Sequence, residues 1–120
     1  MNKTLVMRPA KTLALVLLPL LFAVHSDAAE RWITSTIKGV YPQADGTFVL
    51  VFNDQYGGPG CANANQYFFL GVGHNGMTAD GSKAMLAASL AAAAEHQSVQ
   101  VAFDDADTTY CWVNRIWVSF

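Results

Sequence analysis

Apolar and polar residues beyond position 30 follow a pattern that predicts five strands. In the first strand Ile33, Ile37 and Tyr41 share one face and polar residues occupy the other, as in a half-buried strand. Gly39 interrupts this strand and predicts a bulge or a sharp bend. The second strand is apolar on both faces, which places it centrally. The predicted strands span residues 32–41, 47–53, 66–72, 99–103 and 110–120.

A single segment between the third and fourth strands has helical periodicity. Ser82 is the expected N-cap, and the helix continues to His96 at its C-terminal end. Most of its other residues are alanine, the strongest helix former. The residues expected on one stripe are Met85, Leu86, Ser89, Leu90 and Ala93.

The resulting order, β-β-β-α-β-β, is that of an OB-fold, a small barrel with its helix between the third and fourth strands. The third and fifth strands of such a barrel are parallel neighbours at the point of closure. Cys61 lies just before the third strand and Cys111 begins the fifth. Both thiols are therefore expected at the same end of adjacent strands, within reach of a disulfide. The sequence predicts a mainly β, OB-like five-stranded barrel with one helix and one disulfide.

Residues 1–29 have the composition of a secretory signal peptide. Lys3, Arg8 and Lys11 precede a 12-residue apolar segment, 13–24. Small residues follow, which favours cleavage after Ala28, with cleavage one residue later as the alternative. The apolar segment is shorter than the ~20 residues that span a bilayer, so no membrane span is expected in the mature form. We predict a secreted or periplasmic protein with one domain, residues 30–120.

The charge balance argues against binding to nucleic acid. The whole chain has a net charge of −2, and removing residues 1–29 leaves four basic and eight acidic residues, a net charge of −4. A binder of phosphate backbones normally presents a basic face. The remaining 91 residues form a small domain that benefits from a cross-link. Two cysteines in an oxidising compartment favour one disulfide, and two buried free thiols are the alternative.

Catalytic and metal-binding patterns are not evident, and we expect no enzyme, cofactor or metal site. His74 lies in a glycine-rich loop without a G-x-S-x-G turn, and His96 suits a helix C-terminus. Asp104, Asp105 and Asp107 lack the order of a calcium-binding loop and are expected in a solvated turn. A small hydrolase with an unrecognised site remains the enzymatic alternative.

Three aromatic residues are candidates for ligand contact. Trp112 and Trp117 lie on the last strand, where the alternation predicts that one tryptophan faces outward. An exposed tryptophan suits stacking on a sugar ring or burial at a subunit interface, and isolated exposure is the alternative. Tyr56 begins a glycine-rich loop that could contact a ligand or could be a simple connector.

The segment from Cys61 to the C-terminus resembles a group of small secreted bacterial OB-like proteins, which includes the B subunit of subtilase-type AB5 toxins. The residues that carry the resemblance are Cys61, Tyr67, Phe68, Phe69, the Lys83–Leu86 and Gln97–Val101 segments, Cys111, Val113, Ile116, Trp117 and Val118. The resemblance implies a disulfide-linked barrel without enzymatic activity. In the toxin branch such barrels form pentameric rings that bind cell-surface glycans, although no glycan-binding residue can be transferred to this chain.

The sequence therefore leaves three hypotheses for function. The first is a secreted binding or assembly module that self-associates and contacts a glycan or a protein. The second is a monomeric periplasmic accessory or inhibitor protein. The third is a small hydrolase.

Overall fold

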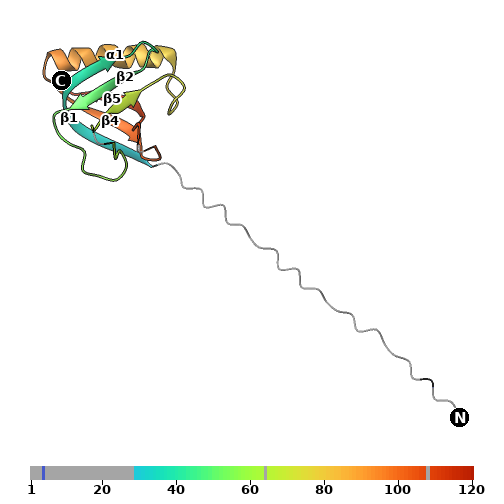
Figure 1. The fold of residues 1–120 in the computed structure, drawn as a ribbon. Helices are drawn as coiled ribbons and strands as arrows, with labels where there is room; N and C mark the ends of the chain where they lie inside the picture. The colour runs from blue at the N-terminus through green and yellow to red at the C-terminus, as the bar shows by residue number, and fades with distance from the viewer. Residues whose placement is uncertain (1–3, 5–28, 64, 108) are drawn as a thin grey trace.

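The computed structural model describes residue 4 and residues 29–63, 65–107 and 109–120 (Figure 1). The predicted signal peptide lies outside the described residues except for positions 4 and 29. The elements follow the predicted β-β-β-α-β-β order. They are β1 (Glu30–Pro42), β2 (Phe48–Phe52), β3 (Phe68–Leu70), α1 (Ala79–Ala94), β4 (Ser98–Asp104) and β5 (Val113–Val118).

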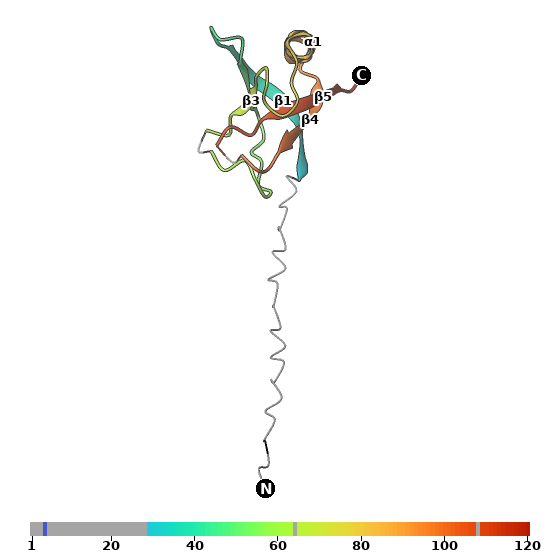
Figure 2. The same ribbon diagram turned by 90° about the vertical axis from the view of Figure 1, so that its right-hand side faces the viewer.

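One five-stranded antiparallel sheet, in the order β3-β2-β1-β4-β5, forms the body of the domain. The long β1 is its centre: residues 30–36 pair with β4, and the later residues pair with β2. The two halves meet at a register shift between Ile37 and Gly39, which confirms the predicted irregularity near Gly39. The shift allows one strand to serve two parts of a strongly curved sheet (Figure 2).

The sheet's two edge strands, β3 and β5, approach each other. The backbone N–H of Phe69 donates a hydrogen bond of 3.2 Å to the carbonyl of Tyr110, just before β5. The described residues show no continuous ladder between these edges, so the mainly β fold is confirmed whereas the closed barrel stays a prediction. The predicted disulfide between Cys61 and Cys111 is present, with a Cα–Cα distance of 5.0 Å.

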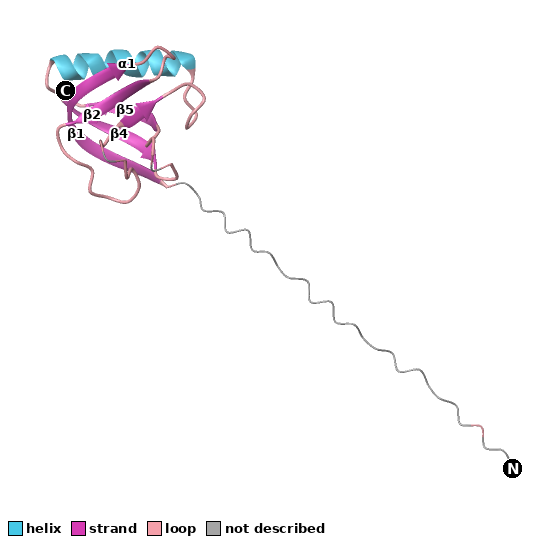
Figure 3. Cartoon of the chain, viewed as in Figure 1, coloured by secondary structure: helices cyan, strands magenta, loops and turns pink. Residues whose placement is uncertain are grey.

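The core lies between the sheet and α1, which crosses one face of the sheet (Figures 1 and 3). Phe68 contacts Phe52 and Phe103 edge to face, each at a centroid distance of 5.2 Å. The helix contributes mostly small side chains, so it packs close to the strands. Of the predicted stripe, Ser89 is fully buried, but Leu90 is 50% exposed and is not part of the core. The fully buried large residues are Phe48, Phe68, Phe103, Leu50, Leu70, Val49, Val99, Val101 and Val113.

The helix begins earlier than predicted. Its N-cap is Thr78, whose hydroxyl accepts a hydrogen bond of 3.0 Å from the N–H of Gly81. Ser82 lies inside the helix and is buried, so the prediction of Ser82 as N-cap was wrong. At the other end His96 adopts a φ of 53° just after the C-cap Glu95, as in a Schellman termination. Among the described residues, no helix is long and apolar enough to cross a membrane.

Candidate functional site

A cleft of about 470 Å³ opens between loops that are distant in sequence. The β1–β2 loop forms one side, and the β4–β5 loop forms another. The strand β3 and the loop that follows it complete the lining. The lining residues are Gln43, Asp45, Thr47, Phe69, His74, Asp107, Tyr110 and Trp112.

Aromatic rings form one wall of the cleft. The imidazole of His74 stacks on Trp112 with a centroid distance of 3.8 Å and an interplanar angle of 4°. Tyr110 lies nearly parallel to the same indole at 5.1 Å. Phe69 contacts both Tyr110 and Trp112 edge to face. Since Tyr110 is 45% exposed, this wall presents aromatic surface to solvent.

Contacts from Gly71 and from the loop after β3 set the position of Trp112. A Cβ atom on Gly71 would lie 2.9 Å from the indole Cζ3, so any other residue at this position would displace the indole. The side-chain amide of Asn75 donates to the backbone carbonyl of Trp112 at 2.8 Å. Asn114 on β5 donates in turn to Asn75 at 3.3 Å. The loop after β3 is therefore joined to β5 beneath the aromatic wall.

Two carboxylates face the cleft from different loops. Asp45 Oδ1 accepts a 2.9 Å hydrogen bond from the backbone N–H of Thr47. Asp107 Oδ1 accepts hydrogen bonds from the backbone N–H groups of Thr109 and Tyr110 at 3.0 and 3.2 Å. These bonds hold each carboxylate in place through one oxygen. Within the described part of the chain, the Oδ2 atoms have no protein donor, so they remain available to a ligand.

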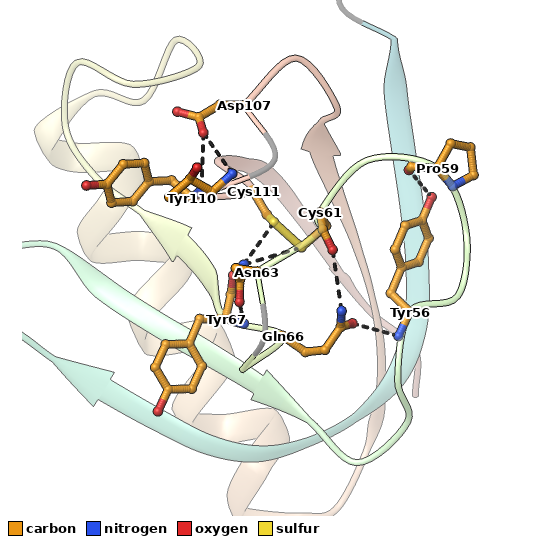
Figure 4. The surroundings of a disulfide bond; sticks show 10 residues. Tyr56, Pro59, Cys61, Asn63, Gln66, Tyr67, Asp107, Tyr110 and Cys111 are labelled. Atoms are coloured by element: carbon orange, nitrogen blue, oxygen red, sulfur yellow. Dashed lines mark hydrogen bonds between the residues drawn. A yellow bond between two sulfur atoms is a disulfide. The ribbon is translucent and has the colours of Figure 1, made fainter.

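The disulfide anchors the loop that carries Asp107 and Tyr110 (Figure 4). Cys61 and Cys111 are 2% and 0% exposed. The side-chain amide of Asn63 donates to Cys111 Sγ at 3.2 Å and to a backbone carbonyl next to β3 at 2.8 Å. The cross-link therefore fixes the β4–β5 loop relative to β3, and both contribute residues to the cleft.

The three aromatic residues predicted to contact ligand lie in three different places. Trp112 lines the cleft, with one face of its indole covered by His74. Tyr56 does not line the cleft: its ring packs on Phe103 at 5.0 Å, and its hydroxyl donates to a loop carbonyl at 2.9 Å. In Figure 4 it lies on the other side of the disulfide from Tyr110.

Trp117 belongs to a second surface, on the face of the sheet that points away from the core. It is 62% exposed, and Trp32 on β1 is 43% exposed. Between them, Arg115 lies 5.6 Å from the Trp32 ring centroid and pairs with Glu30. We call Trp32, Arg115 and Trp117 the tryptophan face.

Most of the cleft was missed by the sequence interpretation. Gln43, Asp45, Thr47 and Tyr110 were not singled out, and Asp107 was placed in a solvated turn. The predicted OB-like order of elements could have pointed to these residues. OB-folds bind oligosaccharides and oligonucleotides through the loops between strands 1 and 2 and between strands 4 and 5.

Metal-ligating residues do not cluster within the described residues, where no three histidine, cysteine, aspartate or glutamate side chains form a group suited to an ion. In comparisons with known proteins, no protein-family model, curated protein or solved structure matches the chain.

Proposed function

We propose that the protein is a secreted, non-enzymatic binding module whose cleft takes a sugar. The observation that carries the proposal is the combination of aromatic and hydrogen-bonding groups in one concave site. The exposed ring of Tyr110 offers an apolar face for a sugar ring, and Asp45, Asp107 and Gln43 offer partners for hydroxyl groups. A concave site with an aromatic lining and few polar groups is typical of small-ligand recognition.

The proposal treats the curved sheet as an OB-like barrel. The order β3-β2-β1-β4-β5 and the contact between its edges support this description. The cleft then lies between the two loops that bind oligosaccharides in other OB-folds. The resemblance to secreted toxin B subunits points to the same class of ligand. The disulfide suits an oxidising compartment, as expected for a secreted or periplasmic protein.

The proposal contains no catalytic step. Within the described residues, the imidazole of His74 makes no hydrogen bond to a hydroxyl or a carboxylate, so no preassembled pair of nucleophile and base is seen at this histidine. Its ring instead stacks on Trp112, which suits a role in shaping the wall.

A glycan array followed by calorimetric titration of the best ligand tests the proposal. Tyr110→Ser removes the exposed ring and should weaken binding by about tenfold or more. Tyr41→Ser is the matched control, because Tyr41 is also an exposed tyrosine, at 50%, but does not line the cleft. No array signal at high protein concentration, or equal affinity of both variants, would overturn the proposal.

A second candidate function is self-association through the tryptophan face. Two exposed tryptophans, on β1 and β5 at either side of β4, are typical of an interface rather than of a solvated surface. We propose that a second copy of the chain covers this face, as in a ring-forming assembly. Native mass spectrometry measures the result directly: a mass near five protomers supports the ring, and a monomer favours the accessory-protein hypothesis.

A matched pair of substitutions locates the contact. Trp117→Ser should dissociate the assembly, while Leu90→Ser, at a site on α1 that is 50% exposed, should leave its mass unchanged. Dissociation by both variants would argue against the tryptophan face as the specific contact.

A further inference from the structure

The charge of the cleft distinguishes between classes of sugar. Its carboxylates are Asp45 and Asp107, and within the described residues no lysine or arginine lines it. The arginines of the domain pair elsewhere: Arg31 binds Asp105, and Arg115 binds Glu30. Among the described residues, a ligand in the cleft therefore meets two carboxylates and no lysine or arginine. This arrangement disfavours acidic sugars by repulsion between like charges.

The carboxylates are also positioned to accept hydrogen bonds from a cation. Backbone N–H groups hold the Oδ1 atom of each carboxylate, and no donor among the described residues is bonded to either Oδ2 atom. An ammonium group supplies up to three donors and no acceptor, which matches an acceptor-only carboxylate. An ammonium group and a carboxylate are both charged, so the bond between them is stronger than the one that a neutral sugar hydroxyl donates to the same carboxylate.

The aromatic wall favours the same ligand. A cation close to the face of a tyrosine or tryptophan ring is attracted by the ring's electrons. Tyr110 and Trp112 form this wall together with Phe69, and Asp107 lies on the same loop as Tyr110. A sugar that carries an amino group can place its apolar ring face on Tyr110 while its ammonium group reaches the carboxylate.

We infer that the cleft selects a sugar with a free amino group over its N-acetylated or acidic counterparts. This inference rests on the proposed sugar-binding function, and it names the feature by which the ligand is chosen. Acetylation removes the positive charge and two of the three N–H donors, so the electrostatic preference is lost while ring stacking is retained.

Calorimetric titration of the mature protein with two hexasaccharides tests the inference. One is an oligomer of glucosamine and the other an oligomer of N-acetylglucosamine, which differ only at the amino group; sialyllactose provides the acidic probe. We expect the glucosamine oligomer to bind about tenfold more tightly or better, and sialyllactose to give no heat.

Neutral variants assign the preference to the cleft. Asp107→Asn retains Oδ1, which accepts the loop hydrogen bonds, but removes the charge. We expect it to abolish most of the preference for glucosamine while binding of the N-acetylated oligomer persists. Asp80→Asn, at an exposed position in the first turn of α1, is the matched control and should keep the preference.

Each outcome bears on a separate claim. Equal affinity for the two hexasaccharides would overturn the inference and leave the proposed sugar binding intact. No binding of either, together with a silent array, would overturn both. A preference for the glucosamine oligomer that persists in the Asp45→Asn variant and in the Asp107→Asn variant would reflect general attraction to an acidic protein. It would overturn the assignment of this preference to the cleft.

Discussion

Replacing both cysteines by alanine tests how much of the stability depends on one cross-link. The Cys61–Cys111 bond joins residues separated by 50 positions. A link that closes a loop of this length reduces the entropy of the unfolded chain and stabilises the folded state by about 4 kcal/mol. Both side chains are fully buried, so truncation also leaves a small void. We therefore expect the double variant to lose about 4 kcal/mol or slightly more.

The loss should be large relative to total stability. For a domain of this size each kcal/mol changes Tm by about 4–8 °C, so Tm should fall by roughly 20 °C. Urea unfolding followed by tryptophan fluorescence measures the free energy of unfolding of the oxidised protein and of the variant. Reduced wild-type protein is the control, because it loses the covalent link without substitution and should resemble the variant.

Two results would refute this reasoning. A difference of less than about 1 kcal/mol would mean that the link does not constrain the unfolded chain as the entropy argument requires. Two titratable thiols in the native, unreduced protein would show that the link is absent.

The other predictions concern the cleft and the start of the domain. Gly71→Ala places a methyl group 2.9 Å from the indole of Trp112, so it should cost about 1–3 kcal/mol and weaken sugar binding; unchanged fluorescence and affinity would contradict the packing. The hydrogen bond from the Ala29 N–H lowers the pKa of Asp105 most, and the Arg31 guanidinium lowers it further. The ionised carboxylate therefore stabilises the folded state at pH values above the usual carboxyl pKa. This stabilisation should be lost as the pH falls through the lowered pKa. In a plot of Tm against pH, Asp105→Asn should therefore remove the acid-side decrease that this carboxylate causes. A plot identical to that of the wild-type protein would count against the contact. Because Ala29 N lies 2.8 Å from Asp105 Oδ1, cleavage directly before residue 29 would place the new amino terminus on this carboxylate, and N-terminal sequencing of exported protein should begin there.

The elements with strong periodicity were predicted well from sequence. The pattern of apolar residues identified all five strands in order, by alternation in the first strand and by a continuous apolar run in the second. The third and fifth strands are shorter than predicted, at Phe68–Leu70 and Val113–Val118, so Cys111 and Trp112 lie just before the fifth strand and not on it. Gln66 adopts a φ of 54°, and its side chain binds the backbone N–H of Tyr56, so the chain is still in a loop at that position.

The N-terminus of α1 was predicted four residues too late, at Ser82 instead of Thr78. Gly81 suggests a turn before Ser82, yet it lies within the first helical turn. There its backbone N–H donates to Thr78 Oγ1 at 3.0 Å, the usual bond from the third helical residue to an N-cap side chain. The position of the N-cap depends on the hydrogen bond between Thr78 and Gly81, which sequence periodicity does not contain.

The cleft could not be predicted from any one segment. Asp45, Phe69 with His74, and Tyr110 come from three separate segments of the chain, and only the curvature of the sheet brings them together. Each residue by itself suits a turn or a core position. The disulfide was the exception, because the expected strand order placed its two cysteines at the same end of neighbouring strands.

The central claim is that the cleft is where the ligand binds. Backbone amide NMR shifts, recorded while the glucosamine oligomer is titrated into the isotope-labelled mature protein, test it most directly. The account predicts that the largest shifts fall on Asp45, Thr47, His74, Asp107 and Tyr110, which line the cleft. Shifts concentrated instead on the tryptophan face, or spread evenly over the acidic surface, would contradict it.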